Sequence, residues 1–176
     1  MRETATSTEY VYKGKILNLR TDTVKTGTGQ TASREVVEHV DSVGIIAIDE
    51  HENILLVNQF RYPVDESLLE IPAGCVETGE NPELTAVREL REETGFAPGH
   101  IKRLGGFYLA PGYATEYMHI YLATGLRYSP LIAEDTESIS LVKKTLPEIK
   151  NLITSGLIKD CKTIAAIAML ANHNGH

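Results

Sequence analysis

The sequence predicts a mixed α/β fold, with a sheet between helices and a set of antiparallel strands in front of it. Two short and almost continuously apolar segments, 43–48 and 54–61, are typical of strands buried on both faces of a sheet. A capped helical segment over 82–94 and an apolar segment over 159–172 are typical of helices that pack on such a sheet. Residues 9–25 alternate aromatic and polar side chains, which predicts an antiparallel hairpin.

Turn and capping signals set the limits of several elements. Gly14 marks the turn of the hairpin. Asn81 is a natural N-cap for a helix that begins at Pro82, and Gly95 fits the left-handed position after its last residue. The other expected elements are, in chain order, a loop at 26–33, a strand at 34–40, a polar turn at 49–53, strands at 103–110 and 117–124, and a helix at 146–155.

With 176 residues and no internal linker, the chain has the size of one domain. We expect an N-terminal antiparallel region over 1–41 and a second region over 42–176. The net charge of -7 argues against general nucleic-acid binding, which needs a basic surface. No apolar run reaches the roughly 18 residues of a membrane span, and the polar N-terminus shows no signal segment. The two cysteines show no metal-ligand spacing. Together with the lack of a membrane span and a signal segment, they lead us to expect a cytoplasmic protein with reduced thiols.

The helix over 82–94 gathers acidic residues, since Glu89, Glu92 and Glu93 fall within five positions. Like charges spaced this closely destabilise an isolated helix by a few tenths of a kcal/mol. Clustered carboxylates suit Mg²⁺ or Mn²⁺, although a plain solvated acidic face is the alternative. At 100° per residue the expected core face holds Leu84, Val87, Leu90 and Thr94, with the three glutamates on the opposite side.

The spacing of this segment resembles the Nudix box, G-x5-E-x7-R-E-U-x-E-E-x-G-U, where U is aliphatic or aromatic. The fixed positions are filled by Gly74, Glu80, Arg88, Glu89, Leu90, Glu92, Glu93, Gly95 and Phe96. The resemblance implies an α/β/α sandwich with a mixed sheet and a hydrolase that cleaves a nucleoside diphosphate linked to another moiety. A pyrophosphate is anionic, so attack by water needs its charge neutralised, and metal ions do this.

The resemblance also implies roles within the box. Glu89 and Glu93 would be the primary metal ligands, with Glu92 in support, and the backbone carbonyl of Ala73 often joins them in relatives. Glu80 and Arg88 would orient these ligands. Gly74 and Gly95 would serve as structural turns.

Flanking segments resemble the ADP-ribose pyrophosphatase subgroup: "SREVVEH" at 33–39, "NQFRYPVD" at 58–65, "LLEIPAG" at 68–74, and Pro111, 15 residues beyond the box. Several side chains there are candidates for substrate contacts, with ordinary surface or packing roles as the alternative. Arg61 and Arg34 have the fork of donors that suits phosphate. The other candidates are Glu70 and Glu116 for the metal or the ribose hydroxyls, and Tyr113, Tyr10 and Tyr12 for stacking on adenine.

A general base must come from outside the box. In the subgroup it is commonly a glutamate on an acidic loop, here "AEDTESI" at 133–139. Glu137 is the best candidate for the base and for a further metal ligand, with Asp135 and Glu134 behind it, and an ordinary acidic loop is the alternative. The chain departs from the subgroup at "HVD", 39–41, where relatives often show His-Pro-Gly.

These resemblances lead to a Mg²⁺-dependent (Mn²⁺ possible) enzyme that hydrolyses ADP-ribose to AMP and ribose 5-phosphate. Another nucleotide-sugar pyrophosphatase, such as one acting on GDP-mannose, is the nearest alternative. A non-catalytic, nucleotide-sensing Nudix-like module is the alternative from another class. The antiparallel strands before the core predict a C₂ homodimer that exchanges its N-terminal strands, as the resembling enzymes do.

Overall fold

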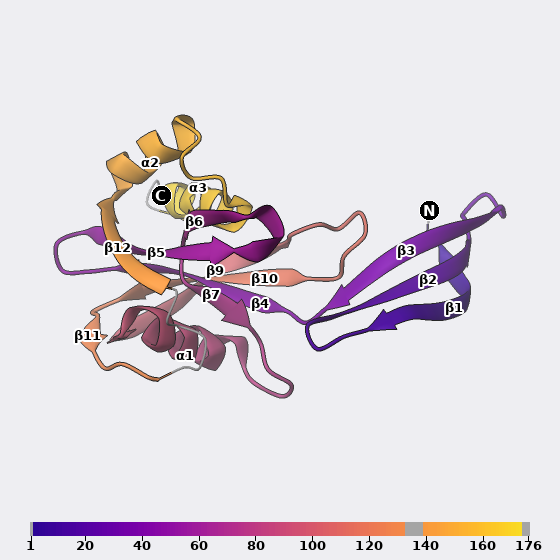
Figure 1. Cartoon of the computed structure of the whole chain (residues 1–176), viewed down its shortest axis with the longest axis horizontal. Coiled ribbons are helices and arrows are strands. Elements are labelled where there is room, and N and C mark those ends of the chain that lie inside the picture. Colours follow the sequence, from indigo (N-terminus) through magenta and orange to yellow (C-terminus); the bar gives the residue numbers. More distant parts are fainter. Residues whose placement is uncertain (1, 133–138, 174–176) are drawn as a thin grey trace. The chain divides into compact units, whose positions relative to one another are not determined.

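The structure is a computed structural model of the chain, described here for residues 2–132 and 139–173. It divides into two compact units. The first unit combines Met1–Asp41 with Tyr108–Tyr117, and the second combines Ser42–Phe107 with Met118–His176. Figure 1 labels most of the elements of both units.

The first unit is a three-stranded antiparallel sheet of β1 (Thr4–Lys13), β2 (Leu17–Lys25) and β3 (Thr31–His39). The hairpin predicted over 9–25 is confirmed. The predicted loop at 26–33 is too long, because β3 begins at Thr31, which pairs with the end of β2 at Lys25. Residues 31–33 are small or polar and none of them is fully buried, so no alternation of apolar residues indicates a strand there.

Residues 108–117 group with this sheet through backbone bonds to β3. The amide of Val37 donates to the carbonyl of Tyr113 at 2.8 Å, and the amide of Thr115 donates to the carbonyl of Val37 at 3.0 Å. The Thr115 hydroxyl accepts from the amide of His39 at 3.0 Å. No local pattern in the sequence indicates this pairing, because it joins residues more than 70 positions apart.

The second unit contains a seven-stranded mixed sheet. Its order is β12-β5-β4-β10-β9, with β6 paired to β5 and β7 paired to β4. β10 runs parallel to β4, whereas β5 runs antiparallel to both β4 and β12. The strands are β4 (Ser42–Ile48), β5 (Asn53–Arg61), β6 (Glu66–Glu70), β7 (Ala73–Cys75), β9 (His100–Tyr108), β10 (Tyr117–Thr124) and β12 (Ile139–Thr145).

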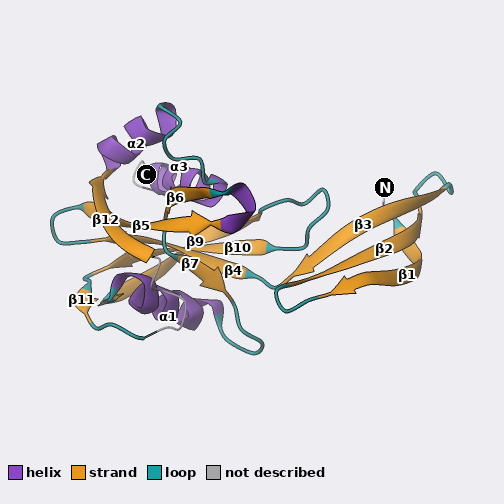
Figure 2. Cartoon of the chain, in the orientation of Figure 1, coloured by secondary structure: helices purple, strands orange, loops and turns teal. Residues whose placement is uncertain are grey.

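Helices cover both faces of this sheet, as Figures 1 and 2 show: α1 (Pro82–Thr94) on one face, and α2 (Leu146–Thr154) and α3 (Cys161–His173) on the other. The predicted sheet between helices is therefore confirmed. Burial of β4 on both faces is also confirmed, since its residues from 42 to 47 are all buried. Alternate β4 residues Val43, Ile45 and Ala47 form a core cluster with α1. None of the helices in the described ranges is long and apolar enough to span a membrane.

The short elements of this unit escaped prediction. They include a 3-10 turn η1 (Tyr62–Val64) and a two-stranded sheet of β8 (Phe96–Ala97) and β11 (Arg127–Tyr128), together with β6, β7 and β12. Segments of two to five residues are too short for a hydrophobic period to register. β12 is longer, but it carries two adjacent lysines and lies at an edge of the sheet.

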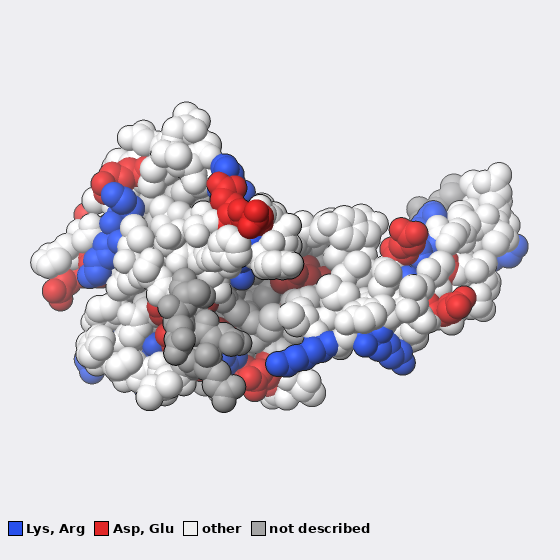
Figure 3. Space-filling model, in the orientation of Figure 1, with Lys and Arg blue, Asp and Glu red and all other residues white. Residues whose placement is uncertain are grey.

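Acidic and basic side chains are interspersed on the face of the molecule drawn in Figure 3. Lys and Arg atoms appear there in several separate groups.

The turn between β4 and β5 depends on Asp49. Its Oδ1 accepts from the amides of His51 at 3.0 Å and Asn53 at 2.9 Å, and its Oδ2 accepts from Lys143 at 3.0 Å. Burial opposes ionisation of Asp49, but the bonds from Lys143 and the two amides outweigh it and lower its pKa to about 2. Since the unfolded pKa is about 3.9, the ionised carboxylate stabilises the fold above pH ~4, and this stabilisation is lost as pH falls through about 2.

Asp49→Ala is therefore expected to lower the free energy of unfolding at pH 7 by about 1.5–3 kcal/mol. The difference from wild type should shrink between pH ~4 and pH ~2, because protonation removes the same interactions from the wild-type protein. Denaturant unfolding across this range measures it. Glu50→Ala, at an adjacent side chain that is 83% exposed, is the matched control and should change little. An undiminished difference at low pH would show that the charge of Asp49 is not the source.

Candidate active site

The helix that carries the glutamates is fixed at both ends as predicted. The Asn81 side chain accepts from the amide of Glu83 at 2.8 Å, and Pro82 occupies the first turn. Gly95 ends the helix with a φ of 80°, a left-handed conformation that glycine adopts without strain. These caps settle which residues belong to α1.

The predicted orientation of α1 is only partly correct, because Leu90 and Thr94 are buried as expected but Leu84 is not. Its buried residues are Thr85, Ala86, Leu90 and Thr94, whereas Leu84, expected in the core, is 63% exposed. Ala86 and Leu90 pack in one cluster with β4, so the buried stripe is rotated toward Ala86 by roughly a fifth of a turn from the expected one. Three residues after each of them come Glu89 and Glu93, which therefore lie at the edge of the core rather than opposite it.

This rotation brings both carboxylates against the backbone of β7. Oε2 of Glu93 accepts from the amide of Ala73 at 3.1 Å. The carboxylate of Glu89 lies over Gly74, where a Cβ built on the glycine would overlap it. Gly74 lies within β7 rather than in the turn expected for it, and its missing side chain is required for the close approach of a carboxylate to the strand.

Burial sets the protonation of these two groups. It is the largest cause that raises the pKa of Glu93, to about 8; the Ala73 amide, Arg61 and Lys162 lower it only in part, and the negative charge of Glu89 raises it further. Burial also raises the pKa of Glu89, against the opposing effect of Arg88. The two carboxylates therefore lack a full complement of positive charge from the protein.

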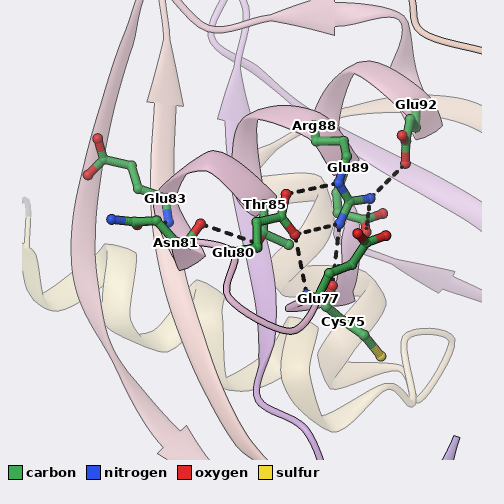
Figure 4. Close-up of polar contacts among 9 residues, drawn as sticks. All are labelled: Cys75, Glu77, Glu80, Asn81, Glu83, Thr85, Arg88, Glu89 and Glu92. Carbon is green, nitrogen blue, oxygen red and sulfur yellow. Dashed lines mark hydrogen bonds and ion pairs between the residues drawn. The ribbon is translucent and has the colours of Figure 1, made fainter.

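Arg88 is hydrogen-bonded to three glutamates of the box, Glu80, Glu89 and Glu92, as Figure 4 shows. Its Nη1 donates to Glu89 at 2.7 Å and to Glu92 at 3.0 Å. Its Nε and Nη2 donate to the two oxygens of Glu80, both at 3.1 Å, and Nη2 also reaches the carbonyl of Cys75 at 3.4 Å. Arg88 is the largest cause that lowers the pKa of Glu80, to about 2. One guanidinium thus holds three carboxylates in place.

A second charged group lies in the same unit. Arg61 donates from Nε to Oε1 of Glu70 at 2.8 Å and from Nη2 to Oε2 at 2.7 Å, a two-point pairing. Glu70 is 1% exposed and also accepts from Lys162 on α3. Burial disfavours its ionised form, but Arg61 and Lys162 outweigh this and lower the pKa of Glu70. Both Glu70 oxygens are therefore engaged by cations of the protein.

The other predicted substrate contacts lie in the first unit. Arg34 pairs with Glu3, with Nη2 at 2.6 Å and Nε at 3.0 Å from its oxygens. Pro111 is exposed, Tyr113 is 60% exposed, and Oε2 of Glu116 lies 3.8 Å from Nδ1 of His39. The candidate bases Glu134, Asp135 and Glu137 lie outside the described residues.

The box residues fit a hard divalent cation. Over 2–132 and 139–173, no three His, Cys, Asp or Glu side chains are gathered as a complete metal site. The donor set is nevertheless suitable, since the carboxylates of Glu89 and Glu93 offer oxygen atoms side by side against the backbone of Ala73 and Gly74. A cation there would favour the ionised form of two carboxylates that burial disfavours.

Gly74→Ala is expected to destabilise the fold by about 1–3 kcal/mol, because the added methyl group displaces the carboxylate of Glu89. In a Glu89→Ala background the same substitution should cost much less, since the overlapping atoms are gone. A double-mutant cycle by denaturant unfolding measures this coupling. Equal costs in both backgrounds would contradict the close approach of Glu89 to Gly74.

An α/β/α sandwich whose box helix carries half-buried carboxylates has the architecture and the site that the Nudix-box resemblance implies. Residues 38–149 match the family described as NUDIX domain. Residues 3–37 match the family described as nucleoside diphosphate sugar hydrolase N-terminal domain. The first match covers more than half of the chain, which therefore belongs to the Nudix hydrolase family.

Relatives extend the similarity over nearly the whole chain. It is 39% identical over 170 residues to a methanol dehydrogenase activator from Bacillus methanolicus, covering 96% of this chain and 92% of that protein. It is 35% identical over 172 residues to an ADP-ribose pyrophosphatase from Bacillus subtilis (strain 168), covering 97% and 93%. A solved structure of an ADP compounds hydrolase has the same fold, with a TM-score of 0.88 and 20% identity over 98% of this chain and 94% of that one.

Proposed function

We propose that this chain hydrolyses ADP-ribose to AMP and ribose 5-phosphate with a divalent cation, Mg²⁺ or alternatively Mn²⁺. The observation that carries this proposal is the burial of Glu89 and Glu93 against the backbone of Ala73 and Gly74. The relative from Bacillus subtilis that is named an ADP-ribose pyrophosphatase, aligned over 97% of the chain, supports the choice of substrate.

In this proposal Glu89, Glu93 and the carbonyl of Ala73 hold the cation, with Glu92 in support. A bound cation supplies neutralisation of the pyrophosphate and a lower pKa for the attacking water. Arg88 keeps Glu89 and Glu92 in fixed orientations through its 2.7 Å and 3.0 Å bonds.

Arg61 is the proposed phosphate contact in the second unit. Its guanidinium carries a full positive charge and is 39% exposed at the side chain, so it remains accessible to an anion. Arg34, Glu116, Pro111 and Tyr113 are proposed contacts from the first unit, for phosphate, ribose and adenine. Tyr113 is 60% exposed, which leaves its ring available for stacking.

Glu137 is the proposed general base. Glu137→Gln is expected to lower kcat by about 10²–10⁴-fold with little change in KM, because it removes the group that takes the proton from water. Steady-state kinetics with ADP-ribose measure this. Glu134→Gln and Asp135→Asn are the matched variants, and a loss of kcat in one of these instead would transfer the role to that residue.

A substrate panel tests the proposal as a whole. ADP-ribose, GDP-mannose and nucleoside triphosphates are compared by kcat/KM, with Mg²⁺ and then with Mn²⁺. ADP-ribose is expected to be the best substrate. Much faster turnover of GDP-mannose or of a triphosphate would overturn this choice. Calorimetric binding of ADP-ribose without release of AMP would favour a sensing module instead.

A second candidate is activation of a partner dehydrogenase. The observation that favours it is the 39% identity, over 96% of the chain, to a protein named a methanol dehydrogenase activator. Addition of the chain to a methanol dehydrogenase, with and without Mg²⁺, tests this role through the rate of alcohol oxidation. A rate that does not change would leave hydrolysis as the function.

We also propose a C₂ homodimer that exchanges its N-terminal strands. All ten residues of β1 are exposed, and Tyr10, Val11 and Tyr12 present apolar surface at an open sheet edge. Val11→Glu is expected to weaken the dimer, as measured by sedimentation. Leu157→Glu, at a residue of the second unit that is 66% exposed, is the matched control. A wild-type monomer at micromolar concentration would exclude the dimer.

A further inference from the structure

Side chains at the start of α3 are hydrogen-bonded to the end of β6. Lys162 donates to Oε2 of Glu70 and lies 2.9 Å from Oδ1 of Asp160, with only 10% of its side chain exposed. A lysine is rarely buried this far unless it is paired, and here it has two carboxylate partners. The pairing joins residues 92 positions apart, so it is a tertiary restraint on β6 rather than a local feature of the helix.

The same turn is also hydrogen-bonded to Ile71, the residue that follows Glu70. Asp160 caps α3, since its Oδ2 accepts from the amide of Thr163 at 2.9 Å and from its hydroxyl at 2.5 Å. The Thr163 hydroxyl in turn accepts from the amide of Ile71 at 2.8 Å, and Thr163 is fully buried. Residues 160–163 thereby fix both the side chain of Glu70 and the backbone that leads to Ala73.

Glu70 transmits this restraint to Arg61. The Nε and Nη2 edge of the guanidinium lies on Glu70 at 2.8 Å and 2.7 Å. Among the described residues, Nη1 has no hydrogen-bond partner, so its donors are the ones available to an anion. The charges of Arg61 and Lys162 both lower the pKa of Glu93, so both cations act electrostatically on a carboxylate of the box.

We propose that Lys162 is a positioning residue for substrate binding, which acts through Glu70 to hold Arg61 with its Nη1 edge toward the pyrophosphate. The proposal rests on the proposed function for its substrate. Lys162 shares Oε2 of Glu70 with Nη2 of Arg61, so it restricts rotation of the carboxylate. It also offsets part of the negative charge of Glu70, which leaves more of the positive charge of Arg61 for the substrate.

Lys162→Met tests this with Lys159→Met as a matched control. Lys159 precedes the same helix and pairs with Glu66 at 2.6 Å, at the other end of β6, but its side chain is 55% exposed. Lys162→Met is expected to raise KM for ADP-ribose about tenfold with a much smaller change in kcat, a usual coupling within one ion-pair network. Lys162→Arg should recover most of the affinity, and Lys159→Met should leave KM unchanged.

The path through Arg61 is tested by a double-mutant cycle. If Lys162 acts through Arg61, then Lys162→Met should have little further effect on KM in an Arg61→Gln background. Additive effects of the two substitutions would overturn the proposal. If Lys162→Met fails to fold, Glu70→Gln preserves the shape of the site and should raise KM by a similar factor.

Nuclear magnetic resonance gives a readout that does not depend on the substrate. The Nε–H of Arg61, assigned by its loss in Arg61→Lys, should exchange with solvent several times faster in Lys162→Met than in wild type or Lys159→Met, since hydrogen bonding protects such groups. Unchanged exchange would overturn the proposal even if ADP-ribose is not the substrate. Changed exchange with no hydrolysis of ADP-ribose by wild type would instead support the positioning role and overturn the proposed function.

Discussion

Glu93→Gln is expected to lower kcat for ADP-ribose by about 10²–10⁴-fold while the protein stays folded. A metal ligand contributes several kcal/mol of charge stabilisation in the transition state, and each 1.36 kcal/mol is a factor of ten in rate. Glutamine keeps the shape of the side chain and an oxygen that can accept from the amide of Ala73. The substitution therefore removes charge with little change in packing. Steady-state kinetics at saturating Mg²⁺ measure the loss.

Unlike kcat, the stability of the metal-free protein should not fall in Glu93→Gln. Burial raises the pKa of Glu93 to about 8, so the metal-free fold opposes ionisation of this group. A folded pKa above the unfolded one means that the carboxylate destabilises the metal-free protein as pH rises above the unfolded value of about 4.3. Glu93→Gln without metal should therefore unfold at the same temperature as wild type at pH 7, or at a higher one. Added Mg²⁺ should raise Tm less in the variant than in wild type.

Glu83→Gln is the matched control for both measurements. Glu83 is an exposed glutamate in the first turn of the same helix, at a variable position of the box. Its substitution should leave kcat and the effect of Mg²⁺ on Tm unchanged, at a small cost in helix stability. Turnover near the wild-type rate in Glu93→Gln would remove Glu93 from the metal site.

Local chemistry made the limits of α1 predictable, and the lack of tertiary information made its orientation unpredictable. The bonds at Asn81 and Gly95 involve neighbours in the sequence, so residue types alone indicate them. The buried face is decided by what packs on the helix, here Val43 and Ile45 of β4. A helical wheel is drawn from the helix sequence alone and contains no such packing, so it could not predict that Leu84 is exposed.

The same distinction separates the predicted and unpredicted parts of the candidate site. Spacing identified the box, including Arg88 and Glu80, because a motif is local in the sequence. Arg61 and Glu70 were candidates for separate substrate contacts, yet in the structure they pair with each other. Lys162 was not foreseen at all. The only signal was "DCKT" at 160–163, an N-cap pattern, and it says nothing about a carboxylate on β6.

Arg88→Met is expected to lower both stability and activity, because it leaves three carboxylates without their shared cation. The side chains of Glu80, Glu89 and Glu92 are 20%, 13% and 18% exposed, so water screens their repulsion only in part. Loss of one partner from a fully buried ion pair costs about 3–5 kcal/mol, and partial exposure reduces this to about 2–3 kcal/mol here. Activity should fall by about 10–100-fold, the usual effect of removing a group that orients metal ligands.

Arg91→Met on the same helix is the matched control, since among the described residues Arg91 donates only to Ser129, at 2.9 Å and 3.3 Å, and to no carboxylate. It should cost about 0.5–1.5 kcal/mol and leave the affinity for Mg²⁺ unchanged. In Arg88→Met, a divalent cation replaces part of the lost positive charge. Saturating Mg²⁺ should therefore raise Tm more in Arg88→Met than in Arg91→Met, as long as Glu89 still reaches the cation. An equal rise in the two variants would mean that the carboxylates held by Arg88 do not meet the metal.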